Sequence, residues 1–299
     1  MIRIGIPQGL LYYEYGRLWE TFFRNLGLTV VLSGQTAQAT MDCSRGLDEL
    51  CLPAKVFIGH CVALRDRVDF LFVPRVVSMS RRQYMCPHLI AMPDLLRANG
   101  AQFPPLIDLE INFRQGWQQR LKALSAIGRY SGKSFSEILS ASIQAWLQQP
   151  RQRAPVPAKE LQIALISHPY ILQDKQLSFN VHGKLRDLSL PVVTADMISR
   201  KQAKKSAKML GKEIYWSACE HLAGAALAFM DRPNPVRGII FLTCFSCGPD
   251  ALIGELIRQQ AAARQIPCLV LPVDEHTAEA GLITRLEAFS DLLRRRQQH

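Results

Sequence analysis

Signals for strands and helices alternate along both halves of this chain, and this alternation constrains its fold more than any other feature. Apolar runs of strand length, some of them ended by proline, are followed by segments in which apolar residues recur with helical spacing. Strands that alternate with helices in this way form parallel sheets that helices cover on both faces. The fold class is therefore expected to be α/β, with two similar parallel-sheet units.

A helical stretch separates the two alternating halves. The first hundred residues are expected to form strands 2–6, 28–32 and 69–73 and helices 15–26, 53–66 and 87–98. The middle is expected to form helices 113–128 and 135–149, followed by a linker at 150–157 that is rich in proline and arginine. The remainder is expected to form strands 161–167, 191–194, 237–243 and 267–271 and helices 177–188, 216–230, 251–263 and 278–293.

The expected elements divide the chain into three parts. These are an N-terminal α/β domain at residues 1–105, a helical segment and linker at 106–157, and a C-terminal α/β domain at 158–299. A length of 299 residues with 48% hydrophobic residues suffices for two domains of ordinary size. The sequence shows neither a secretory leader pattern nor an apolar stretch of membrane-spanning length. We therefore expect a cytoplasmic protein that does not bind a membrane.

The formal net charge of +11 raises the question of nucleic-acid binding. The cations are scattered, with the densest groups at residues 200–208 and 294–296, and no helix-turn-helix or RNA-binding signature accompanies them. A solvated helix face and a basic tail explain these groups, so nucleic acid is not expected as a partner. A docking surface for an acidic partner, or for a phosphate-bearing ligand such as coenzyme A, stays open as an alternative.

Three cysteines stand one or two residues before a proline at the start of an expected helix. They are Cys51, Cys86 and Cys247. Proline is favoured at the first helical position because the N–H that it lacks would have no partner there. A cysteine just before it faces the free amide groups and the positive end of the helix dipole, which favour the thiolate. Three such thiolates suggest a metal centre, and an iron–sulfur cluster is the first candidate.

The remaining cysteines are weaker candidates. Cys244 completes a lone CxxC, which could be a redox dithiol or half of a zinc site, but the sequence offers no second pair for zinc. Cys244 is therefore treated as a strand-end residue near the metal centre and as a candidate extra ligand. Cys219 and Cys268 are expected to lie in the core, where a cysteine behaves as a small apolar residue.

Several segments of the chain resemble one family. The resemblance covers most of the chain and is weakest at residues 100–160 and 200–215. It is with the 2-hydroxyacyl-CoA dehydratase / benzoyl-CoA reductase superfamily, and more closely with its branch of activase-associated and double-cubane iron–sulfur proteins of the DUF2229 type. The segments that carry it are residues 5–13, 18–23, 51–55 with 59–60, 167–170, 245–250 and 274–289.

The resemblance implies two flavodoxin-like domains with a cysteine-ligated iron–sulfur cluster in the cleft between them. Cys51, Cys86 and Cys247 match the family's cysteine motifs. It also implies a partner, a small ATP-hydrolysing iron–sulfur activase that supplies a low-potential electron. In the CoA-dependent members the electron goes to an acyl-CoA thioester, whereas the double-cubane members reduce small molecules. The chain has no Walker A motif and no GxGxxG after a strand, so any ATP dependence would come from that partner.

The number of irons depends on which cysteines take part. Three thiolates would leave one iron of a [4Fe–4S] cluster open to substrate, water or a bridging sulfide. A double cubane would need about six thiolates. Only Cys43, Cys61 and Cys244 could supply the remainder, so a single cluster is preferred.

The histidines of the family-like segments have two interpretations. His60, His168 and His276 could hydrogen-bond a cluster sulfide or transfer a proton, and each could equally be structural. The acidic residues that begin at Asp274 precede the last expected helix, and helix capping alone would place them there.

Two functions are carried forward. The first is an iron–sulfur redox protein that takes electrons from the activase and reduces an acyl-CoA or a small molecule, working with a paralogous subunit or as a homodimer. The alternative is a non-catalytic binding or assembly protein, or an electron-relay subunit, on the same fold.

Overall fold

The structure is a computed structural model of the 299-residue chain. It describes residues 1–43, 47, 49–100, 102–149, 162–232 and 235–296, so the linker expected at 150–157 lies outside the described residues. The chain divides into two compact units, Met1–Arg151 and Gln152–His299. Each unit is described by itself.

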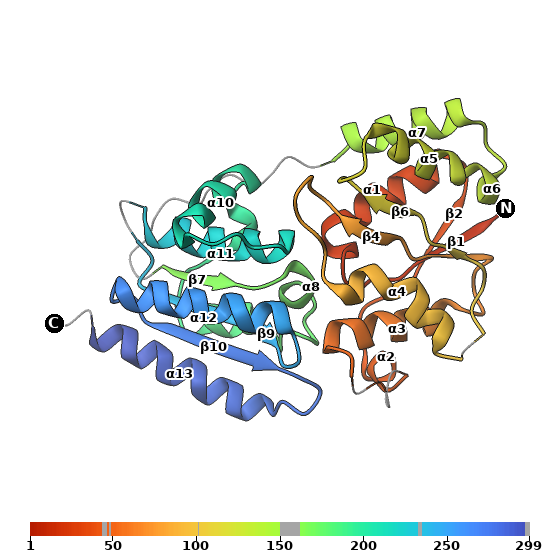
Figure 1. Ribbon diagram of the computed structural model, residues 1–299. Helices are drawn as coiled ribbons and strands as arrows, with labels where there is room; N and C mark the ends of the chain where they lie inside the picture. The colour runs from red at the N-terminus through yellow and green to blue at the C-terminus, as the bar shows by residue number, and fades with distance from the viewer. Residues whose placement is uncertain (44–46, 48, 101, 150–161, 233–234, 297–299) are drawn as a thin grey trace. The chain divides into compact units, whose positions relative to one another are not determined.

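The first unit is built on a parallel sheet in the order β2-β1-β3-β5 (Figure 1). A second, two-stranded parallel sheet pairs β4 with β6. The strands of the first unit are β1 (Arg3–Ile6), β2 (Thr29–Leu32), β3 (Phe70–Phe72), β4 (Arg75–Ser78), β5 (Leu106–Ile107) and β6 (Glu110–Asn112). Its helices are α1 (Tyr12–Asn25), α2 (Gln38–Asp42), α3 (Leu52–Leu64), α4 (Pro87–Ala98), α5 (Trp117–Ala126), α6 (Gly128–Ser131) and α7 (Phe135–Leu147).

The core of the first unit shows why the helical stretch belongs with this sheet. The side chains of Ile4 and Ile6, two positions apart in β1, lie on the same face of the strand. There they belong to one apolar core with Phe23 of α1 and Ile138 of α7. Helix α3 is buried along most of its length, which agrees with its nearly uniform apolar sequence. Helices α1 and α7 therefore cover one face of the sheet.

The second unit is built on a parallel sheet in the order β10-β9-β7-β8 (Figure 1). Its strands are β7 (Ile163–Ile166), β8 (Val192–Thr194), β9 (Gly238–Cys244) and β10 (Cys268–Val273). Its helices are α8 (Pro169–Leu172), α9 (Val181–Asp187), α10 (Arg200–Ala207), α11 (Ser217–Met230), α12 (Gly248–Ala263) and α13 (Glu279–Arg295), with 3₁₀ turns η1 (Ala195–Met197) and η2 (Lys208–Leu210).

Helices pack on both faces of the second sheet. Ile239 and Phe241 of β9 lie in a core shared with α11 and α12. On the other face, the Gly238 position lies directly against Phe289 and Leu293 of α13. Every residue of β9 is buried, as expected for a central strand of a parallel sheet.

Both four-stranded sheets have the same topology, with the strands of each unit in the order second, first, third, fourth. This is the flavodoxin-like order, and the structure confirms the expected α/β fold class. Such sheets have a switch point between their first and third strands, where ligands bind beyond the carboxyl ends. The switch points lie between β1 and β3 and between β7 and β9.

Several local expectations differ from the structure. Residues 106–112, expected at the start of a helical segment, form β5 and β6, which are too short to show a period. The helix expected at 177–188 begins only at Val181, because the Asp174 carboxylate holds a turn before it. The helix expected at 251–263 begins at Gly248, three residues earlier.

Candidate metal centre

The three candidate cysteines occupy the same structural position in three helices. Cys51, Cys86 and Cys247 are the N-cap residues of α3, α4 and α12, each with a proline at the first or second helical position. All three side chains are half-buried. The amide groups of a first helical turn lack intrahelical partners and stabilise negative charge. These positions therefore suit thiolate ligands, as the sequence pattern predicts.

The first unit brings two of these helix starts together. The Cys51 sulfur lies 3.6 Å from Nδ1 of His88, which belongs to the first turn of α4, two residues after Cys86. Cys51 and Cys86 therefore belong to neighbouring helix N-termini within one unit. His88 is a polar neighbour that sequence reasoning did not single out. Its only signal is its place in the Cys-Pro-His segment.

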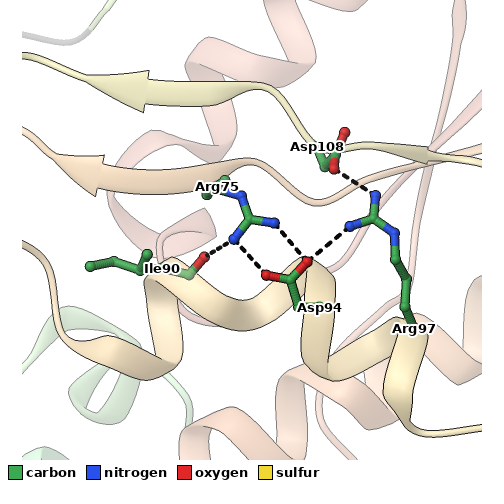
Figure 2. A network of polar contacts seen from close by, with 5 residues as sticks. All are labelled: Arg75, Ile90, Asp94, Arg97 and Asp108. Atoms are coloured by element: carbon green, nitrogen blue, oxygen red, sulfur yellow. Dashed lines mark hydrogen bonds and ion pairs between the residues drawn. The ribbon is translucent and has the colours of Figure 1, made fainter. Parts of the chain in front are cut away.

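A network of charged side chains holds α4, the helix whose N-cap is Cys86, from its middle to its C-terminal end (Figure 2). Arg75 of β4 donates to both carboxylate oxygens of Asp94, at 2.7 and 2.8 Å, and to the carbonyl oxygen of Ile90 at 3.0 Å. Arg97 bridges Asp94 and Asp108. The hydrogen bond from Arg75 lowers the pKa of the Asp94 carboxyl. Two arginines thus tie α4 to β4 and to the connection between β5 and β6.

Cys247 follows β9 through a tight loop. Its backbone N–H donates to the carbonyl oxygen of Cys244, the last residue of the strand, at 3.2 Å. Between them, Ser246 has a φ of 39°, which is left-handed backbone that a non-glycine residue rarely adopts. Phe245 is 68% exposed. The loop therefore holds the Cys247 N-cap beside the switch point of the second sheet.

A buried polar group lies directly behind this loop. The Asp250 side chain is 1% exposed and accepts hydrogen bonds from Nε2 of His168 at 2.8 Å and from the Thr243 hydroxyl at 2.9 Å. The Cys219 sulfur lies 3.7 Å from the same carboxylate, and the Cys247 side chain also hydrogen-bonds to it. Sequence reasoning did not single out Asp250, because nothing local marks it as buried.

The environment keeps this carboxylate ionised. Burial by itself would raise the pKa of Asp250, but the charge of His168 and the hydrogen bonds from His168, Thr243 and Cys247 outweigh burial, and the pKa lies below its usual value. His168 also stacks on Tyr170, with ring centroids 4.8 Å apart. His168, which the sequence left between two interpretations, thus has a defined charged partner.

His168, Cys219 and Asp250 are close enough together to be considered as ligands of one ion. The 2.8 Å between Nε2 and the carboxylate oxygen is a hydrogen-bond distance. Two ligands on one tetrahedral zinc, with bonds near 2.0 Å, would lie roughly 3.3 Å apart. The group is therefore a hydrogen-bonded network in this structure.

The other cysteines differ from the three N-cap residues. Cys61 is completely buried in α3, and burial raises the pKa of its thiol well above the usual value. Cys244 and Cys219 are buried, and burial raises the pKa of Cys268 to about 11 against the opposing charge of Arg258. Cys43 is exposed at the end of α2. The three N-cap cysteines are thus the ones that combine partial exposure with a helix start.

The other histidine positions have local roles. His60 is fully buried, with Nε2 3.0 Å from the Thr36 hydroxyl. His276 is exposed in a turn that the Asp274 carboxylate holds by accepting from the His276 N–H and the Thr277 hydroxyl. Asp274 therefore caps a local turn, and Glu279 of the same stretch forms an ion pair with Lys184.

One apolar cavity lies at the switch point of the first sheet. Its lining includes Pro7 and Gly9 after β1, Val73 after β3, Phe57 of α3 and Leu89 of α4. Its volume is about 20 Å³. A volume of this size holds roughly one water molecule. It is therefore no preformed site for a thioester substrate.

Comparison with known families identifies the chain's relatives. Residues 3–198, more than half of the chain, match the family described as "CoA enzyme activase uncharacterised domain (DUF2229)". The chain belongs to this family, whose description links it to CoA enzyme activases. No curated protein matches the sequence. Among the described residues, no helix combines the length and apolar character needed to cross a membrane.

Proposed function

We propose that this chain is an iron–sulfur redox protein that works with a CoA enzyme activase. Cys51, Cys86 and Cys247 would hold the cluster, a [4Fe–4S] cluster in the simplest case. The observation that carries the proposal is that these three cysteines, alone among the cysteines that the structure describes, are half-buried N-caps of helices with a proline at the first or second position. Such a donor set suits iron bound as a thiolate complex.

The bound cluster would supply low-potential electron transfer to an acyl-CoA or a small molecule. The chain's own residues have simpler tasks. The helix N-termini stabilise the thiolates, and the Arg75–Asp94 network holds α4, the helix whose N-cap is Cys86. His88 lies against Cys51 and could orient its sulfur. The electrons would come from the separate ATP-dependent activase.

A second candidate function is electron relay, or assembly, without a substrate of its own. The cavity at the first switch point, with a volume of about 20 Å³, is itself too small for a CoA thioester. In that case a paralogous subunit, or a second copy of the chain, would hold the substrate. Titration of the anaerobically purified chain with acyl-CoA thioesters separates the two functions, since a relay subunit would not bind them.

The first experiment is anaerobic purification followed by measurement of iron and acid-labile sulfide, with an EPR spectrum after dithionite reduction. About four irons per chain would support one cluster, and about eight would indicate a double cubane that recruits further cysteines such as Cys244. No iron after anaerobic reconstitution would refute the redox function and leave a binding or assembly protein.

Single substitutions assign the ligands. Each of Cys51→Ala, Cys86→Ala and Cys247→Ala is expected to lose most of the iron and the EPR signal, because each removes one thiolate. Cys268→Ala is the matched control, since this half-buried cysteine begins strand β10 and belongs to neither candidate ligand set, and it should retain wild-type iron. Full iron in all three test variants would contradict the assignment.

A further inference from the structure

Two segments that lie far apart in the sequence meet through one buried contact. His168 precedes α8, beyond the end of β7, and Asp250 lies in the first turn of α12, beyond the end of β9. His168 is 3% exposed and Asp250 is 1% exposed, and Nε2 of His168 lies 2.8 Å from a carboxylate oxygen of Asp250. The contact spans the switch point of the second sheet between β7 and β9. Asp250 lies three residues after Cys247.

The Asp250 carboxylate has an unusually complete set of partners. His168, Thr243, Cys219 and Cys247 approach it from different parts of the unit. An ionised carboxylate accepts up to about four hydrogen bonds. A buried charge without partners is strongly unfavourable, so the carboxylate constrains all the groups around it.

The Cys247 loop needs such a constraint. Only Phe245 and Ser246 separate the end of β9 from the N-cap, and Ser246 has a φ of 39°. Backbone in this region is unfavourable for a non-glycine residue and persists only where the surroundings hold it. The Phe245 N–H donates to the carbonyl oxygen of Val273 at 2.9 Å, which holds the start of the loop. The Phe245 side chain is largely exposed, so contacts on the inner side of the loop have to hold the residues that follow.

We propose that His168 and Asp250 are a positioning pair for Cys247: the His168–Asp250 contact fixes the first turn of α12, and thereby places the Cys247 sulfur for its ligand role. The inference rests on the proposed function, because it assigns the pair a purpose at the same thiol. It extends that function by naming two residues that would control the ligand without touching the metal.

The test uses the full chain, purified anaerobically and reconstituted with ferrous iron and sulfide. Asp250→Asn keeps the size of the side chain but places an amide donor among groups that already donate. It is expected to hold iron about 10- to 100-fold less tightly against a chelator, the range found when partners of metal ligands are removed. Asp274→Asn is the matched control, since Asp274 caps a turn after β10 without contacting a cysteine, and should behave as the wild type.

A second readout does not require iron. In the iron-free chain, the rate at which iodoacetamide modifies Cys247 is measured by peptide mass spectrometry, with the exposed Cys43 as the internal reference. Release of the loop should raise the rate at Cys247 several-fold in His168→Leu, which leaves the Asp250 carboxylate in place beside the Cys247 thiol, and should leave the rate at Cys43 unchanged. A wild-type chain that binds no iron would refute the proposed function, and this second comparison would still decide the positioning role.

Milder variants cover the case in which Asp250→Asn does not fold. Thr243→Val removes one donor to the carboxylate and keeps the side-chain shape, so a smaller change in the same direction is expected. His168→Gln keeps an N–H donor and should retain more iron than His168→Leu. Unchanged iron retention and unchanged Cys247 alkylation in Thr243→Val and His168→Leu would overturn the proposal.

Discussion

At the scale of single residues, position decides what a cysteine can do. Cys51 and Cys61 lie in or next to the same helix, yet the first is a half-buried N-cap and the second is fully buried with a raised pKa. The first thiol is available as a ligand, whereas the second behaves as a small apolar side chain. The two thiols differ because Cys61 lies ten residues further along α3 than Cys51. Cys61 is therefore shielded from solvent and far from the free amide groups of the first helical turn.

His221 gives a residue-scale prediction about pH. Burial, together with the charge of Arg200, lowers the pKa of His221 to about 4, although Nε2 lies 3.1 Å from the carbonyl oxygen of Ala195. An unfolded histidine has a pKa of about 6.5. Because the folded-state pKa is lower, the unfolded state binds more protons, and the stability present above pH 6.5 is lost as the pH falls towards 4. By pH 5 this group should reduce the free energy of unfolding by about 2 kcal/mol.

Urea unfolding at pH 7.5 and pH 5 measures this effect. The decrease between the two pH values should be smaller by about 2 kcal/mol in His221→Gln than in the wild type. His276→Gln is the control, since His276 is exposed, and it should show the full wild-type decrease. Equal decreases in all three proteins would show that His221 does not titrate as stated.

At the scale of elements, close contact between helices depends on individual glycines. Gly224 of α11 faces α10, and a Cβ atom there would lie 2.0 Å from the backbone oxygen of Ala203. Ala203 and Ala207 are the buried residues of α10, while its basic side chains face solvent. Small residues on both helices therefore let two backbones pack together.

Gly224→Ala tests this contact. Alanine normally stabilises a helix interior relative to glycine by about 0.5–1 kcal/mol. Here the added methyl group would clash with the backbone of α10, so we expect Gly224→Ala to lower the free energy of unfolding by about 1–3 kcal/mol, as overpacking does. In Gly281→Ala of α13, where no heavy atom lies within 4 Å of the added Cβ, the ordinary stabilisation is expected. Thermal unfolding of both variants checks the prediction, and stabilisation by Gly224→Ala would contradict it.

At the scale of the whole molecule, the chain consists of two units, each with its own sheet and core. Each has about 150 residues, an ordinary length for a domain that folds alone. The proposed ligands are divided between them, with Cys51 and Cys86 in the first unit and Cys247 in the second. We therefore expect each unit to fold alone, but we expect metal binding to require both units.

Expression of residues 1–151 and 152–299 as separate chains tests this division. Each fragment should unfold cooperatively, because its core is complete. Neither should hold the iron of the full chain, because neither has all three proposed ligands. Circular dichroism and iron analysis measure the two properties. A fragment with the full iron content would show that one unit suffices for the site.

Much of the fold could be predicted because it depends on local patterns. The helix Pro87–Ala98 begins and ends where the sequence indicates, since proline marks its start and helical spacing of apolar residues its length. The N-cap positions of the three cysteines follow from the same local rule. The strands Leu106–Ile107 and Glu110–Asn112 escaped prediction, because two or three residues without a longer apolar run show no period.

The sequence by itself determined the class of fold and the proline-marked helix starts at which Cys51, Cys86 and Cys247 lie, because backbone preferences act over a few neighbouring residues. Only the tertiary structure decided that the Asp250 carboxylate is buried against His168, 82 positions away, and that Arg75 and Arg97 share Asp94. These contacts depend on the order of strands within each sheet. That order brings the ends of distant strands together, and the burial of a charge then requires a partner that no local pattern specifies.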